Sequence, residues 1–238
     1  MFFNQKNDTG PALYTKSKMP AVLDLGFIEV LEVMGSDLTV VNAARVSFHK
    51  ESHEMTLGDS KLIKYLAKYN HVTPFFHPQI RLRLKMPIFV AREWFRHQIG
   101  FARNEVSRRY VDDKPECYTP VIARARDAKV KQGSKDEGVP ENERAVQMIS
   151  TLNQTCMDTY DQLLGMGVAP EVARTILPQG MFTEFIETGS LAAYARLCQL
   201  RLDPSAQWEI RQYAEAVRTA LLAYFPVSWD ALTQDTPA

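Results

Sequence analysis

The chain has few cysteines and lacks a long apolar run. Its three cysteines, Cys117, Cys156 and Cys198, form no CxxC pair among 238 residues, so we expect neither a disulfide framework nor a metal site. No apolar stretch is long enough to span a bilayer, and the first residues lack the pattern of a signal peptide. These absences predict a cytoplasmic protein with no membrane partner.

Net charge is absent as well. The 28 Lys and Arg residues balance 28 Asp and Glu residues, so the chain has no overall field that would hold nucleic acid. Any site for an anion must therefore be local. No GxGxxG motif follows a strand-like segment, which argues against a Rossmann-type dinucleotide site.

The hydrophobic pattern predicts one α+β domain, with a mixed or antiparallel sheet flanked by helices. Residues 1–22 have little periodicity and are expected to form an extended or mobile arm, followed by a single domain over residues 23–238. We expect strands at 27–34, 79–86 and 180–187, and helices at 38–45, 59–69, 87–98, 142–164, 170–177, 190–202 and 205–224. The polar segment 111–140 is expected to be a long loop with a short strand near Tyr118. Candidate capping positions are Ser36 or Asp37, Asp59 or Ser60, Pro87 at the first helical turn, and Asp203-Pro204.

Residues 93–110 contain an unusual density of polar chemistry. Four arginines, a histidine, two carboxylates, a serine and an asparagine lie among a few apolar residues. Arginine presents a planar fork of donors that matches phosphates and the oxygens of heterocycles. The stretch therefore predicts a site for an anionic, nucleotide-like ligand. A non-enzymatic nucleotide- or RNA-binding module built on the arginines of residues 92–110 is the alternative, although the zero net charge argues against it.

Four ordered motifs resemble the flavin-dependent thymidylate synthases. They are His71-Val-Thr73-Pro-Phe, Arg96-His97-Gln98 followed by Ser107-Arg108-Arg109-Tyr110, Glu171-Val-Ala-Arg174 with Leu177-Pro178, and Leu200-Arg201 followed by Ala206-Gln-Trp-Glu-Ile210. Together with Gly26-Phe27 and Ala44-Arg-Val-Ser-Phe48, they span roughly residues 25 to 225. A single such motif is a weak signal, but four in the family's order are specific.

The resemblance implies a homotetramer whose catalytic domain, residues 23–238, makes dTMP from dUMP. It further implies FAD as the cofactor, 5,10-methylenetetrahydrofolate as the carbon donor and NADPH as the reductant. Carried over by position, the residues expected at dUMP are Glu93, Arg96, Glu105, Ser107, Arg108, Arg109, Arg174 and Arg201. Those expected at FAD are Ser47, His71, Thr73, Arg96, His97, Gln98, Asn104, Glu105, Ser190, Ala192 and Arg196.

The chain departs from the family pattern in several places. Gln98 replaces an arginine, and eight residues rather than seven separate it from Ser107. Glu93 lies where glutamine is common. Ser190, Ala192 and Arg196 replace the Asn, Arg and Asn of other members, which leaves individual flavin contacts open.

Catalysis is expected to depend on Arg201 and Ser107. Methylation of a uracil ring at C5 needs electron density there, supplied either by a cysteine thiolate at C6 or by removal of the N3 proton. A guanidinium beside the ring favours the resulting anion, and the resemblance assigns this role to Arg201. Ser107 is a nucleophile, a hydrogen-bond donor or a turn residue, and we favour the donor. The rival thiolate would be Cys117, the only cysteine in a polar, loop-like setting.

Overall fold

The computed structural model describes residues 21–111, 113–128 and 133–233 as a single α+β domain. The arm expected at residues 1–22 lies outside the described part except for Ala21 and Val22. No helix in the described ranges is both long and apolar enough to cross a membrane.

A four-stranded antiparallel sheet forms the centre of the domain. Its order is β1 (Phe27–Met34), β2 (Gln79–Pro87), β6 (Phe182–Ser190) and β3 (Phe101–Glu105). The three expected strands are confirmed, whereas β3 was not expected.

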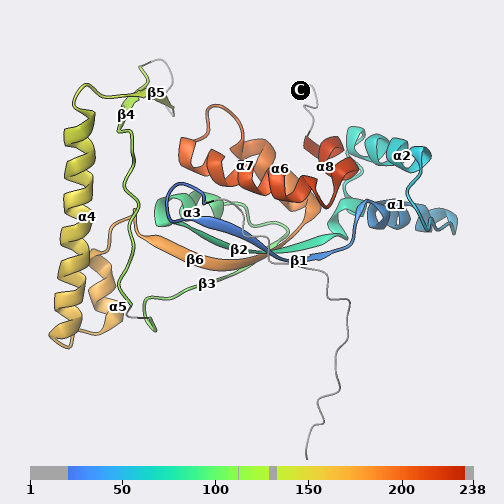
Figure 1. Cartoon of the computed structure of the whole chain (residues 1–238). Coiled ribbons are helices and arrows are strands. Elements are labelled where there is room, and N and C mark those ends of the chain that lie inside the picture. Colours follow the sequence, from blue (N-terminus) through green and yellow to red (C-terminus); the bar gives the residue numbers. More distant parts are fainter. Residues whose placement is uncertain (1–20, 112, 129–132, 234–238) are drawn as a thin grey trace, which may run out of the picture.

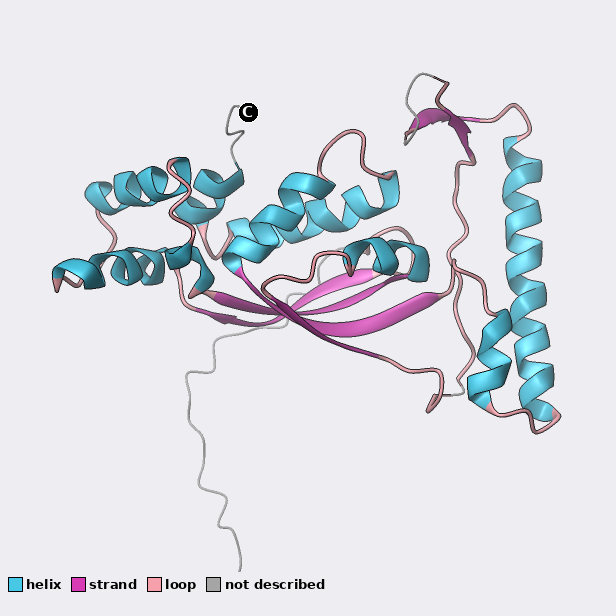
Figure 2. Ribbon diagram, turned by 180° about the vertical axis from the view of Figure 1, so that it is seen from behind, coloured by secondary structure: helices cyan, strands magenta, loops and turns pink. Residues whose placement is uncertain are grey.

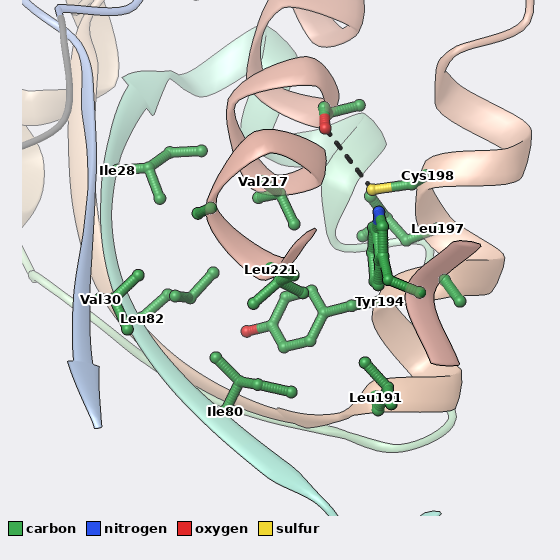
Figure 3. Packing of buried hydrophobic residues seen from close by; sticks show 14 of the residues in the cluster. Ile28, Val30, Ile80, Leu82, Leu191, Tyr194, Leu197, Cys198, Val217 and Leu221 are labelled. Carbon is green, nitrogen blue, oxygen red and sulfur yellow. Dashed lines mark hydrogen bonds between the residues drawn. The ribbon is translucent and has the colours of Figure 1, made fainter. Parts of the chain in front are cut away.

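Helices cover one face of this sheet (Figures 1 and 2). They are α3 (Ile88–Trp94), α6 (Leu191–Arg201), α7 (Trp208–Leu222) and α8 (Pro226–Thr233), with α1 (Asp37–Arg45) and α2 (Leu57–Lys68) extending beside α8. Figure 3 shows the packing, in which strand residues such as Ile80 and Leu82 meet Tyr194 of α6 and Leu221 of α7. All four are fully buried, so the sheet and α6 form a closely packed support for the residues at their ends.

The other end of the molecule carries α4 (Asn142–Gly165), α5 (Pro170–Ala173) and the short 3-10 helix η3 (Arg174–Ile176) (Figure 1). A hairpin of β4 (Arg124–Arg126) and β5 (Ser134–Gly138) lies near the start of α4. Two further 3-10 helices are η1 (Val46–Phe48) and η2 (Thr73–Phe76). The expected loop at 111–140 therefore contains a hairpin, which the sequence hid because β5 is polar and wholly exposed.

Several helix boundaries differ from expectation, and one helix was not expected. Helix α2 begins after Thr56, whose hydroxyl accepts a hydrogen bond from the Asp59 N–H at 3.2 Å, so Asp59 completes the cap from inside the helix. Helix α7 begins after Gln207, because the Asp203 carboxylate instead closes a turn with Ser205. Helix α8 was not expected.

Helix α3 is shorter than the expected 87–98. Pro87 ends β2 and precedes the helix rather than occupying its first turn, and the helix ends at Trp94. The chain then turns at Gly100, which has a φ of +85°, and enters β3. This early end makes residues 95–100 a loop between α3 and β3, and that loop carries the Arg96-His97-Gln98 motif.

Candidate functional site

Arg201 lies at the end of α6 and is held from two directions. Its Nη1 forms an ion pair with Oε1 of Glu93, and its Nε donates to Nε2 of His97 at 2.8 Å. Glu93 comes from α3 and His97 from the loop that follows it. The arginine and Glu93 line a cavity of about 460 Å³. Three segments therefore fix one guanidinium at the edge of a cavity.

His97 is a neutral acceptor in this arrangement. Burial lowers the pKa of its imidazole to about 4, with further lowering by Arg201, Arg196 and Arg103. A neutral imidazole carries its proton on one nitrogen only, so acceptance at Nε2 assigns the proton to Nδ1. The imidazole was expected to contact flavin, and it is only 8% exposed with Nε2 already in contact with Arg201.

A second cavity, of about 290 Å³, lies at the other end of β3. Glu105, Ser107, Arg108 and Arg174 line it together. Arg174 is exposed and forms no side-chain hydrogen bond or ion pair within residues 21–111, 113–128 and 133–233. Arg108 pairs with Asp113 at 2.8 Å. This cavity thus offers one unpaired guanidinium and one that is already neutralised.

Other expected dUMP contacts are arranged differently. Arg109 is exposed and pairs with Glu171 at 3.2 Å. Thr183 donates its hydroxyl to Oε1 of Glu105 at 2.6 Å, so this carboxylate is partly occupied. Arg96 is exposed on the 95–100 loop.

The expected flavin contacts come mainly from segments that pack near the start of α6. Gly100 brings the 95–100 loop so close that an added Cβ would lie 2.8 Å from the Ala193 Cβ and 3.2 Å from the Ser190 Oγ. The same loop is held by Arg196, whose Nη2 donates to the carbonyl of Ile99 at 2.6 Å. Helix α6 also contacts η2, which begins at Thr73. Residues 73, 95–100 and 190–196 therefore form one neighbourhood.

The remaining residues expected at FAD differ in their position and in whether their side chains are already hydrogen-bonded or stacked. Ser47 follows the first residue of η1, and His71 stacks on the ring of Tyr65 with a centroid distance of 6.1 Å. Ser190 is 2% exposed, and its hydroxyl caps α6 by accepting from the Ala193 N–H. Asn104 is exposed on β3.

Similarity to known proteins agrees with this arrangement of motifs. The sequence model of the family described as "Thymidylate synthase complementing protein" matches residues 29–227. A flavin-dependent thymidylate synthase of Thermus thermophilus is 39% identical over 213 residues, covering 90% of this chain and 77% of the relative. That of Thermotoga neapolitana is 39% identical over 214 residues, covering 90% and 93%. The chain belongs to the flavin-dependent thymidylate synthase family.

A solved structure shares the fold of this thymidylate synthase. The UMP/dUMP methylase PolB of Streptomyces cacaoi, bound with 5-Br dUMP, superposes with a TM-score of 0.79 and 27% identity, covering 87% of this chain and 94% of that one. The chain is accordingly an enzyme of the methyltransferase class. The alternative of a non-enzymatic RNA-binding module is set aside.

The rival thiolate mechanism is unsupported in this family member. Burial raises the pKa of the Cys117 thiol to about 11, with a smaller contribution from Cys156. A thiol with that pKa is protonated at neutral pH and is a poor nucleophile. His49 and His53 have the four-residue spacing of some metal sites, but they lie in the irregular segment between η1 and α2, and no described residues form a group of three metal-binding side chains.

Two polar residues in the interior beside the candidate site were missed by sequence reasoning. Arg103 of β3 turns inward and forms an ion pair with Glu187 of β6, which is 0% exposed. The alternation of β6 was a usable signal, because Glu187 falls on the same face as buried Phe185. The sequence did not indicate that Arg103 is the partner of Glu187, because β3 itself was unexpected.

Proposed function

We propose that this enzyme converts dUMP to dTMP, taking the carbon from 5,10-methylenetetrahydrofolate and the reducing equivalents from NADPH. The state of Arg201 carries the proposal. Its guanidinium is oriented by Glu93 and His97, while Nη2 has no partner among the described residues and stays available to a ligand. Such a group can recognise the oxygens of a pyrimidine in a fixed orientation.

The chemistry required at the uracil ring suits this arginine. When the N3 proton leaves, the ring becomes an anion and C5 gains electron density. A permanently protonated guanidinium beside the ring favours that anion, and each unit by which it lowers the N3 pKa corresponds to about 1.4 kcal/mol. Because the Cys117 thiol has a pKa of about 11, activation without a thiol adduct is the favoured route.

The phosphate of dUMP would bind in the 290 Å³ cavity. Arg174 is unpaired among described residues, and a charge-assisted hydrogen bond to phosphate would satisfy it. Ser107 would serve as a donor. Its Oγ accepts from the Arg109 N–H at 3.4 Å, and no described side chain lies within hydrogen-bond reach to act as its base.

The residues near the start of α6 fit FAD. Arg96 and Gln98 are exposed and their side chains make no hydrogen bonds within the described ranges, as is true of the Ser47 and Thr73 hydroxyls. Guanidinium, amide and hydroxyl donors together suit a diphosphate. FAD supplies the redox and carbon-transfer chemistry when bound. Ser190 and Ala192 would contribute through the backbone, because the Ser190 hydroxyl is occupied as a cap.

A complete site would require more than one copy of the chain. Arg174 and Arg201 line separate cavities, although both are expected at the same nucleotide. Exposed apolar side chains on and beside the outlying helix α4, including Met148, Leu152 and Met166, offer a surface for another subunit. These features support the expected homotetramer with shared sites.

Anaerobic reduction of the FAD-loaded protein tests the function. NADPH should bleach the yellow flavin faster when dUMP is present, and addition of methylenetetrahydrofolate should then yield dTMP. A protein that binds dUMP but forms no dTMP would contradict the reaction. Normal dTMP formation with another reductant would contradict only the choice of NADPH.

A further inference from the structure

A charged pair lies in the interior, outside both cavities. Glu187 is fully buried, its carboxylate oxygens each accept from the Trp94 indole N–H at 3.2 Å, and one of them pairs with Nε of Arg103. A buried ion pair gains little net stability over apolar packing, because both charges lose their hydration. The placement of this pair therefore suggests a positional role.

Arg103 has a second, separate contact. Its Nη1 donates to the backbone carbonyl of His97 at 2.6 Å. The guanidinium also lies over the rings of Phe101 and Phe95, at 4.6 and 5.2 Å from their centroids. The side chain is only 13% exposed, so these contacts leave it one conformation. Arg103 thereby ties the 95–100 loop to the buried carboxylate of β6.

The same histidine contacts Arg201 through its ring. His97 is thus held by its carbonyl and presents Nε2 to the Nε of Arg201, whose Nη1 pairs with Glu93. The contacts run without a gap from the buried Glu187 to the edge of the cavity that Arg201 lines. Arg196 holds the neighbouring Ile99 carbonyl, so it supports the loop but not this connection.

We infer that Arg103 and Glu187 are positioning residues, which orient the Arg201 guanidinium through His97. The inference rests on the proposed function of Arg201, and neither residue lines the cavity that Arg201 faces. This role explains why residue 103 is an arginine. A guanidinium can donate to the Glu187 carboxylate and to the His97 carbonyl at the same time through separate nitrogens, whereas lysine has a single ammonium nitrogen.

Protonation of His97 would break this connection, because an imidazolium has no lone pair for Arg201. The cations that act on the imidazole are Arg201 and Arg196 on α6 and Arg103 on β3, and two of them are paired with carboxylates, Arg201 with Glu93 on α3 and Arg103 with Glu187 on β6. The arginines disfavour the imidazolium and the carboxylates favour it. Loss of Arg103 would remove one opposing cation together with the carbonyl contact, so it should make protonation easier.

Two variants of Arg103 test the inference. Arg103→Met should lower kcat roughly tenfold at neutral pH, because the Arg201 guanidinium is then less well oriented toward the charge that develops in the reaction. It should also move the acid limb of kcat/KM to higher pH. Arg103→Lys should lower kcat similarly but leave the acid limb near its original position, because the positive charge remains. Glu32→Gln, which breaks the exposed pair with Arg81 on the same sheet, is the control and should change neither quantity.

Folded Arg103→Met protein, verified by circular dichroism, with an unchanged kcat and an unchanged acid limb would overturn the inference. A measurement on the unaltered protein covers the case in which the variants do not fold. Imidazole nitrogen NMR at neutral pH should show His97 with its proton on Nδ1, and the opposite tautomer would equally overturn it. The NMR result needs no turnover, so failure of the proposed function, seen as absent dTMP formation, is distinguishable from failure of this network.

Discussion

Arg201 and Arg174, which are both expected to contact dUMP, differ in how firmly neighbouring side chains hold them. Arg201 has a side chain only 19% exposed, and it is held by Glu93 and His97 at the junction of α3 and α6. Arg174 is exposed on η3 and has no side-chain partner within the described ranges. The first comes from the rigid helical layer over the sheet, and the second from the outlying end near α4 (Figure 1).

The difference indicates different contributions to catalysis. A guanidinium that is already oriented loses little conformational freedom when the ligand binds, so its interaction can be directed at charge that develops in the reaction. An unrestrained arginine must lose up to about 2 kcal/mol of side-chain entropy, and it suits a strong permanent anion such as phosphate. We therefore expect Arg201 to govern turnover and Arg174 to govern binding.

The largest effect is expected from Arg201→Ala. Turnover of dUMP should fall at least about a hundredfold, because the anionic ring loses its neighbouring cation. The protein should remain folded, since the side chain lies at a helix end. Steady-state kinetics with saturating substrates measure the change, and Arg218→Ala, which removes an exposed pair on α7, is the control. Near-normal turnover would remove Arg201 from the mechanism.

Arg174→Ala should act on binding instead. We expect the KM for dUMP to rise about 10- to 100-fold, the range for one lost charge-assisted hydrogen bond, with kcat within about threefold of its original value. The same kinetics and control apply. A fall in kcat as large as that of Arg201→Ala would abolish the distinction between the two arginines.

His97→Gln should alter how stability depends on pH. The native pKa of about 4 lies below the ordinary value of 6.5, so between these values the unfolded chain takes up a proton that the native protein does not. The free energy of unfolding should therefore fall as pH falls from 6.5 to 4. Glutamine does not titrate, so it removes this contribution. Between pH 7 and 5 the free energy of unfolding of the variant should therefore fall by about 1–2 kcal/mol less than that of the unaltered protein. Urea denaturation at several pH values would reveal it, and parallel curves would contradict a neutral buried His97.

Cys117→Ala should have the smallest effect. The thiol is protonated at neutral pH because burial raises its pKa to about 11, so neither arginine depends on it. We expect kcat and KM within about twofold of their original values. Loss of activity in a folded variant would support the mechanism in which the Cys117 thiolate adds to C6, and it would contradict activation by a guanidinium alone.

Segments with a strong local pattern were predictable. Strand β2 alternates, and its Ile80, Leu82 and Leu84 are fully buried, while the helix expected over 190–202 is confirmed as α6, Leu191–Arg201. Strand β3 was missed because only Phe101 and Arg103 are partly buried, and the strand exists by pairing with β6. A strand held by a distant partner leaves little periodicity of its own.

The amino-acid sequence by itself determined the family, the α+β class and the residue types expected at the ligands, because these follow from ordered motifs and local periodicity, whereas the antiparallel pairing of the strands needed the fold. Tertiary structure decided what each arginine does. Arg103 and Arg109 belong to the same polar stretch, yet Arg103 turns inward to pair with the buried Glu187 and Arg109 is exposed beside Glu171. Their chemistry is identical, so only the partners supplied by distant segments of the folded chain distinguish them.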